Sequence, residues 1–360
     1  MPNFNYGSIY GFYSPTDQTG AKDYLNSLSR AIPPYVVAQN LGKLSPLTRR
    51  LLEHSEVKSI SFPFISQPVA KKEINNVQKV DYNASFNVPS AVDVDLADMA
   101  TFYFNLALST FIATDFEVKA YEQGNPNVLY DAVKVRASET WIGLMSQIAT
   151  WLTGTRVSGG TEDTTQIYGI KDAIDNGTVN SNYGNIDRSA NTYWNSYIWD
   201  AQTLFGTGLA NFIYVMRALS KYQKLASTMG LPDVGFTSPA GFQALAESFT
   251  NIERYIVADP AKLDETRQYE VTGIAINGIP IFPDPYIADD TSSTEIFFIN
   301  WSHLRLVFSD GYAVTASDWK DLSITGKLAY FSYLLFGAQL FCDAPIAHFR
   351  LQNMPIATGV

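Results

Sequence analysis

The sequence predicts a fold that mixes helices and strands, with the longest helices in the middle of the chain and strands on both sides. Three observations predict it. Residues 80–88 alternate strictly between apolar and polar side chains, which is typical of a half-buried strand. Residues 127–152 carry apolar side chains at spacings of three, four and seven, which is typical of an amphipathic helix. From residue 266 onward, aromatic and β-branched runs alternate with turn residues.

Residues 1–57 have weak periodicity and many glycines and prolines, so they predict an extended arm with at most a short helix near residues 23–30. Residues 1–58 carry a net charge of +2. Because the whole chain has a net charge of -10, the remaining residues carry -12. Such an arm could meet DNA or an acidic neighbour, or could simply be solvated. The acidic total argues against nucleic-acid binding as the main task, because binding phosphates needs clustered basic residues.

Residues 58–91 predict a long β-hairpin. Ile60, Phe62 and Phe64 alternate with less apolar residues, a polar turn follows at 71–76, and the alternating run 80–88 comes next. A long hairpin is marginally stable by itself, so we expect it to pack against something else, such as another chain.

The middle of the chain begins with Asp93, Asp95 and Asp98, which we interpret as solvated residues. The glycine and the terminal bidentate acid of a calcium loop are missing, so no metal site is predicted.

The elements expected after these aspartates are a buried strand (102–114), a helix (127–152) with Val135, Ile142 and Met145 among its buried residues, a second helix (about 200–229) and a third helix (about 238–254). They are followed by a hairpin (273–281) turning at Asn277-Gly278, a strand or short helix (295–308) and a β-rich tail (328–353).

Catalytic motifs are nearly absent. Gly206 and Gly208 form part of a dinucleotide-binding pattern, but the third glycine is missing and the segment lies within a helical stripe. Two pairs of neighbouring acids, 162–163 and 289–290, leave a glycosidase-like site possible, although chance pairs are expected among 35 acidic residues. A dispersed Ser/His/Asp triad also stays open, since its members need not be neighbours in sequence.

Cysteine and histidine are scarce in this chain. Cys342 is the only cysteine, so no intrachain disulfide can form, and its apolar context predicts an inert core residue. The three histidines, His54, His303 and His348, lie far apart in sequence. The chain start lacks the features of a signal peptide, and no apolar run is long enough to span a membrane, so we expect a soluble protein made in a reducing compartment.

Residues 168–194 form a polar, aromatic-studded segment rich in Gly, Asn and Asp, which predicts a long loop; such loops usually carry function or interactions. Its pattern, Gly169-Ile170, then Gly184-Asn185-Ile186-Asp187-Arg188-Ser189, then Trp194, resembles a motif of the major capsid proteins of tailed bacteriophages. Asn185 stands where a second glycine is common in that family. Later segments also resemble the family in their order: 236–245, 278–284, 296–307, 334–340 and 350–353.

The resemblance implies an α+β fold, the tailed-phage major capsid (Johnson) fold, with two tightly joined domains. Its implied parts are an N-terminal arm (1–57), an extended loop (58–91), a peripheral domain with a long spine helix (92–159), an axial domain (160–325) and C-terminal strands returning to the peripheral domain (326–360). It implies a major capsid protein that self-assembles into hexamers and pentamers of an icosahedral head enclosing double-stranded DNA. It implies no catalytic residue, no cofactor and no metal.

The implied partners are other copies of the chain, and also portal, scaffold or decoration proteins, with packaged DNA touched weakly and no membrane. The location would be the virion, after synthesis in the host cytoplasm. Candidate contacts between subunits are Lys71, Lys72, Glu73, Asn75 and Asn76 at the hairpin tip, and Gly184, Asp187 and Arg188 in the loop. Two alternatives remain: a glycan-active or other hydrolase using paired carboxylates, and another structural component of a virion.

Overall fold

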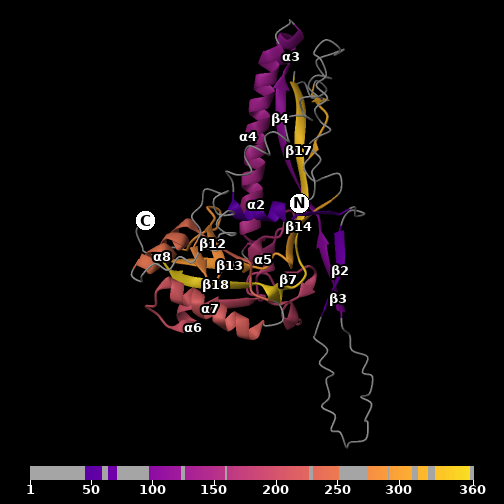
Figure 1. Cartoon of the computed structure of the whole chain (residues 1–360). Helices are drawn as coiled ribbons and strands as arrows, with labels where there is room; N and C mark the ends of the chain where they lie inside the picture. Colours follow the sequence, from indigo (N-terminus) through magenta and orange to yellow (C-terminus); the bar gives the residue numbers. More distant parts are fainter. Residues whose placement is uncertain are drawn as a thin grey trace, which may run out of the picture.

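The protein is described here by a computed structural model, in which two six-stranded sheets share one molecule with a long helix that rises beside the first sheet (Figure 1). The described residues are 45–58, 64–70, 97–122, 126–158, 160–226, 230–250, 274–290, 292–309, 315–322 and 329–356. Most of the predicted arm, the predicted hairpin tip at 71–76 and the alternating run 80–88 lie outside them.

The first sheet is organised around its longest strand, β17 (Ala329–Cys342). One edge of β17 pairs antiparallel with β4 (Asn105–Thr114). The other edge pairs in turn with β16 (Lys320–Asp321), β15 (Thr315–Ala316) and β14 (Leu304–Ser309), and β1 (Glu56–Lys58) runs parallel to β14. Beside β4 lie α3 (Asp115–Glu122) and α4 (Pro126–Thr153), so that β4, β17 and α4 form one elongated tower (Figure 1).

The predicted long helix is confirmed as α4, which has 28 residues and is therefore about 42 Å long. Its buried side chains recur every three or four residues: Val133, Ala137, Trp141, Leu144, Ile148 and Leu152. The prediction that Val135 and Ile142 are also buried is wrong, because they are 54% and 41% exposed. Apolar residues occur on more than one side of α4, so spacing alone does not reveal which side the sheet covers.

The second sheet has the order β11-β12-β10-β13-β18-β9. Its strands are β9 (Tyr197–Asp200), β10 (Val234–Thr237), β11 (Ile274–Ile276), β12 (Ile279–Pro283), β13 (Ser293–Ile299) and β18 (Phe349–Pro355). Three helices pack against it: α6 (Ala201–Phe205), α7 (Asn211–Leu225) and α8 (Pro239–Thr250). Phe298 joins the core beneath these helices, whereas its neighbour Phe297 joins the core of the first sheet, so both faces of β13 are buried.

Several predicted elements are confirmed and others divide. The helix starting at Pro239 is confirmed as α8, and Asn277-Gly278 is confirmed as the turn between β11 and β12, with φ values of 54° and 78°. The predicted single helix at 200–229 is wrong: α6 and α7 are separate, because Gly206 and Gly208 adopt positive φ.

Two runs that were each predicted as one element, the strand 102–114 and the strand or short helix 295–308, also divide between different sheets. The run 102–114 is the end of β3 (Ala97–Tyr103) followed by β4, with the buried Phe104 between them. β3 pairs antiparallel with β2 (Phe64–Ala70) to form a two-stranded ribbon beside the first sheet. The run 295–308 contains most of β13 and β14, joined by the turn 300–303, which leads from the second sheet into the first.

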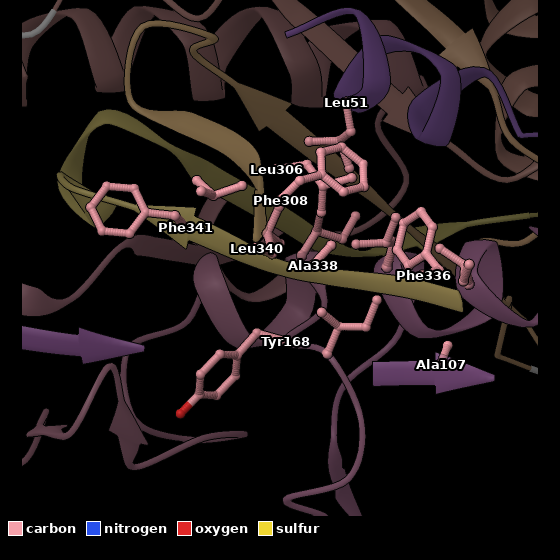
Figure 2. Close-up of a cluster of buried hydrophobic side chains, with 14 of the residues drawn as sticks. Leu51, Ala107, Tyr168, Leu306, Phe308, Phe336, Ala338, Leu340 and Phe341 are labelled. Atoms are coloured by element: carbon pink, nitrogen blue, oxygen red, sulfur yellow. The ribbon is translucent and has the colours of Figure 1, made fainter. Parts of the chain in front are cut away.

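The last part of the predicted arm contains a helix that the sequence did not predict. This helix, α2 (Pro46–Glu53), begins with Ser45 as its cap, and Leu47 and Leu51 are fully buried. Figure 2 shows Leu51 packed toward the side chains of β14 and β17. The buried carboxylate of Asp284, just after β12, accepts hydrogen bonds from the Ser45 hydroxyl and the Leu47 N–H. Burial raises the pKa of Asp284 above its ordinary value.

The remaining short elements lie mostly between α4 and β9. They are β5 (Val157–Ser158), β6 (Thr161–Glu162), α5 (Ile170–Ala173), β7 (Asn182–Tyr183), β8 (Ile186–Asp187), η3 (Thr192–Trp194) and, before β18, η5 (Pro345–Ala347). None of the helices within the described residues is long and apolar enough to cross a membrane.

Candidate assembly surfaces

The loop at 168–196 folds around the buried side chain of Arg188, which is 1% exposed. Its guanidinium donates to the backbone carbonyls of Trp194 (3.1 Å), Asp172 (2.7 Å) and Ala173 (2.9 Å). Arg188 was predicted to contact another subunit. The structure corrects this prediction, because the side chain is fully occupied in holding its own loop together.

Asp175 supplies the opposite charge beside Arg188, with 3.7 Å between Arg188 Nη1 and Asp175 Oδ2. The same carboxylate oxygen accepts three backbone N–H bonds, from Gly177 (2.9 Å), Val179 (2.9 Å) and Asn180 (3.0 Å). Burial lowers the pKa of Arg188 below its ordinary value, and the neighbouring Asp175 charge opposes that shift. The charge pair and the backbone bonds together offset the cost of burying these ions.

Gly184 is buried against the ribbon rather than exposed for a neighbouring subunit, so that prediction is also corrected. It has φ of 61°, and a Cβ there would lie 2.6 Å from the Phe102 ring of β3. Its carbonyl accepts a hydrogen bond from Thr101 N (2.8 Å). Asp187, in contrast, is exposed, and bonds from the Ser189 N–H and hydroxyl lower its pKa. Asp187 therefore stays a predicted contact.

Two further contacts hold β3, one near each of its ends. The Tyr193 hydroxyl donates to Asp98 Oδ2 (2.8 Å). The buried Gln339 of β17 accepts from Tyr168 N (2.8 Å) and donates to the Tyr103 carbonyl (2.6 Å), where β3 ends. The loop 168–196 therefore supports the β2–β3 ribbon and fixes its direction.

The outer face of the ribbon is open to water and carries two apolar pairs, separated by the hydrogen-bonded polar pair Ser66 and Thr101 (3.1 Å). In the antiparallel register Phe64 is opposite Tyr103, and Pro68 is opposite Met99, so these four side chains share one face. Met99 and Tyr103 are 54% and 55% exposed. The other face is buried, through Ile65, Val69, Ala100 and Phe102. The sequence signal for β3 was weak because both of its faces are largely apolar, which hides the period-two pattern.

The tower carries a second exposed apolar face. Leu108 and Ile112 of β4 lie opposite Leu335 and Phe331 of β17, which places all four on one face of the sheet. Leu108 is 55% exposed, whereas the alternate residues of β4 pack in the core with α4. An antiparallel sheet normally presents polar residues on its solvent side, so an apolar face here indicates a contact surface.

The residues considered for chemistry have local roles. Glu162 pairs with Arg156 (Oε1 to Nε, 2.7 Å), and Asp163 accepts bonds from Thr165 N (2.9 Å) and Gln166 Nε2 (2.7 Å). The pair at 289–290 is exposed. In the described part of the chain, no three His, Cys, Asp or Glu residues are grouped as a metal site would need. The predicted contacts Lys71, Lys72, Glu73, Asn75 and Asn76 lie outside the described residues.

Similar solved structures include proteins of phage capsids and of an encapsulin complex. The protein in the cyanophage A-1(L) capsid asymmetric unit aligns with a TM-score of 0.58 and 16% identity, over 86% of this chain and 92% of that chain. The capsid of Myoviridae phage XM1 gives 0.49 and 12% (86% and 93% covered), and the holo-SrpI encapsulin complex from Synechococcus elongatus gives 0.49 and 10% (86% and 87%).

No family model and no curated protein matches the sequence. The fold assignment therefore depends on the cyanophage protein, whose similarity extends over most of both chains. The chain has the α+β fold of phage capsid proteins, the Johnson fold that the order of its motifs implied.

Proposed function

We propose that this chain is a major capsid protein that self-assembles into hexamers and pentamers of an icosahedral phage head enclosing double-stranded DNA. The observation that carries the proposal is the similarity in fold to the cyanophage capsid protein over 86% of this chain. A fold alone does not assign a function, so the proposal also needs a surface suited to self-assembly.

The two exposed apolar faces are such surfaces. An isolated subunit would leave Met99 and Tyr103 of the ribbon, and Leu108 of the tower, in contact with water. Large apolar side chains gathered on one exposed face mark sites where proteins associate. In a closed shell the same contact is repeated by symmetry, so a modest contact between two copies becomes a large total stabilisation.

In this proposal the main partner is another copy of the chain. Portal, scaffold or decoration proteins would be further partners, and DNA would be touched only weakly, because a net charge of -10 does not favour phosphate binding. The location would be the virion after synthesis in the host cytoplasm, and the chain would act as a structural protein rather than as an enzyme.

The test is the assembly state of the purified protein, measured by sedimentation velocity and by negative-stain electron microscopy over a range of concentration, salt and pH. We expect capsomer rings or closed shells. A monomer of 39.9 kDa under every condition would refute the proposal. Glycan hydrolysis that is lost in Glu162→Gln would favour the hydrolase alternative instead.

A further inference from the structure

The three histidines, which are far apart in sequence, meet at one place in the structure. That place is the turn 300–303, which leads from β13 of the second sheet to β14 of the first. His303 belongs to the turn. The ring of His54 stacks on a tryptophan of the turn, and the ring of His348 is bonded to the turn's backbone.

His348 is fully buried between η5 and β18, and it can hold the turn only while it is neutral. Its Nδ1 accepts a hydrogen bond from the Asn300 backbone N–H (3.1 Å). The ring proton is therefore on Nε2, which has no hydrogen-bond partner among the described residues. A second proton on Nδ1 would set two donors against each other, so protonation requires the Asn300 bond to break. Burial, with a smaller effect of His303, lowers the pKa of His348 to about 3.

Charged groups surround the turn on several elements, and most are paired. The pairs are His303 Nδ1 with Asp343 Oδ1 (2.8 Å), Arg305 with Asp343 (3.1 Å) and with Glu56 (2.6 Å), Asp233 with the Trp301 N–H (2.8 Å), and Arg350 with Asp175 and Glu295 (3.7 Å each). None of the bonds found for the His348 ring is to a carboxylate. A proton on this ring would therefore lack the direct counter-ion that His303 has in Asp343.

The N-terminal part of the described chain is attached at the same place. His54, at the end of α2, stacks on Trp301 with ring centroids 4.9 Å apart. Glu56 of β1 bonds to Arg305 of β14, and β1 pairs with β14. The turn therefore connects three parts of the molecule: the first sheet, the second sheet and the segment α2–β1.

We propose that the turn 300–303 is an acid-sensitive joint, in which uptake of a proton by His348 releases the Asn300 N–H and loosens the attachment of both sheets and of α2–β1. The inference concerns the folded subunit and stands whether or not the protein forms shells. Opening of the joint exposes the imidazole to water, where its ordinary pKa of about 6.5 applies. Acid therefore stabilises the open state relative to the closed one.

Amide hydrogen exchange at pH 7 to 4, corrected for the chemical exchange rate at each pH, tests the joint. In the parent protein we expect the protection of peptides covering residues 299–304 to fall by up to about tenfold per pH unit below pH 6.5, as expected for one proton taken up on opening. Peptides from the middle of α4 should change much less. Equal pH dependence in both regions would overturn the proposal.

Two matched variants assign the effect to His348. In His348→Asn the amide oxygen can occupy the place of Nδ1 and accept from Asn300, but it does not titrate, so the pH dependence should fall below about twofold per unit. His303→Asn makes the same change at the partly exposed neighbour and should keep the parent's dependence. The opposite ranking of the two variants would refute the assignment.

If His348→Asn does not fold, ring titration of the parent protein by NMR decides the question. We expect the His348 ring of the closed state to stay neutral down to about pH 4. Protonation near pH 6.5 with the Asn300 amide still protected would show that the joint tolerates the charge, and would overturn the proposal.

Discussion

At the scale of single residues, the loop 168–196 depends on side chains whose partners come from other parts of the chain. Arg188 satisfies backbone carbonyls on both sides of it, and Gly184 lets the loop approach the ring of Phe102. Both residues belong to the motif that resembles the capsid family, and both are buried. Their contribution is to stability and to the direction of the ribbon, rather than to direct contact with another subunit.

Gly184→Ala should destabilise the subunit by about 2–4 kcal/mol, because the new Cβ collides with Phe102 and the residue has a left-handed backbone. The matched control is Gly208→Ala, which also has positive φ (78°) but has nothing within 4 Å of the new Cβ. The control should cost about 1 kcal/mol. Urea unfolding followed by circular dichroism measures both, and equal losses would mean that the Phe102 contact is unimportant.

At the scale of elements, α4 shows how a helix can be found in sequence while its buried side is misassigned. Leu144 faces the core, whereas Ile142, two residues earlier, is 41% exposed. Both are apolar, and only the position of β4 and β17 distinguishes them. The exposed side of α4 remains available to other contacts.

Leu144→Ala should lower the free energy of unfolding by about 2–5 kcal/mol, since it removes buried methyl groups and leaves a cavity. Ile142→Ala on the same helix should change it by less than about 1 kcal/mol, because the lost burial is smaller and alanine is the better helix former. Thermal and urea unfolding of the two variants provide the comparison. A greater loss of unfolding free energy in Ile142→Ala than in Leu144→Ala would show that the core lies on the Ile142 side of α4.

At the scale of the whole molecule, the exposed ribbon and tower faces are where assembly would occur. The double variant Met99→Ser/Tyr103→Ser should unfold at nearly the parent's urea concentration, because both side chains are already half exposed. It should raise the concentration needed for assembly by about tenfold or more, since a loss of about 1.4 kcal/mol per contact corresponds to that factor.

Leu225→Ser is the matched control for the ribbon variant, because Leu225 is similarly exposed but lies at the end of α7. Light scattering against protein concentration gives the assembly threshold of each variant. Unchanged assembly of the ribbon variant would show that the β2–β3 face is not a contact between subunits.

Acid should weaken the whole subunit through His348. Its pKa is about 3 when folded and about 6.5 when unfolded, so the unfolded chain binds the extra proton and stability falls as pH decreases between these values. Between pH 6.5 and 5 this group alone should remove about 1.6 kcal/mol. Urea unfolding of the parent at the two pH values should show this loss, and His348→Asn should lack it. A variant that loses as much as the parent would show that other groups account for the acid sensitivity.

The sequence by itself determined those features that depend on neighbouring residues. Periodicity predicted α4, the Ser-Pro pair predicted the start of α8, and Asn277-Gly278 predicted a turn, because helix caps and tight turns are decided by a few adjacent dihedral angles. The order of motifs pointed to the capsid fold before any geometry was known.

Only the tertiary structure decided which apolar residues are buried and which polar residues meet. In the tertiary structure, α2 packs into the core, and the runs 102–114 and 295–308 are each divided between two sheets. Arg188 and Gly184 are buried inside one subunit. The tertiary structure also brought the histidines together at the turn 300–303. The physical reason is that burial and pairing depend on contacts between segments up to hundreds of residues apart, whereas local patterns specify only the period and the ends of an element.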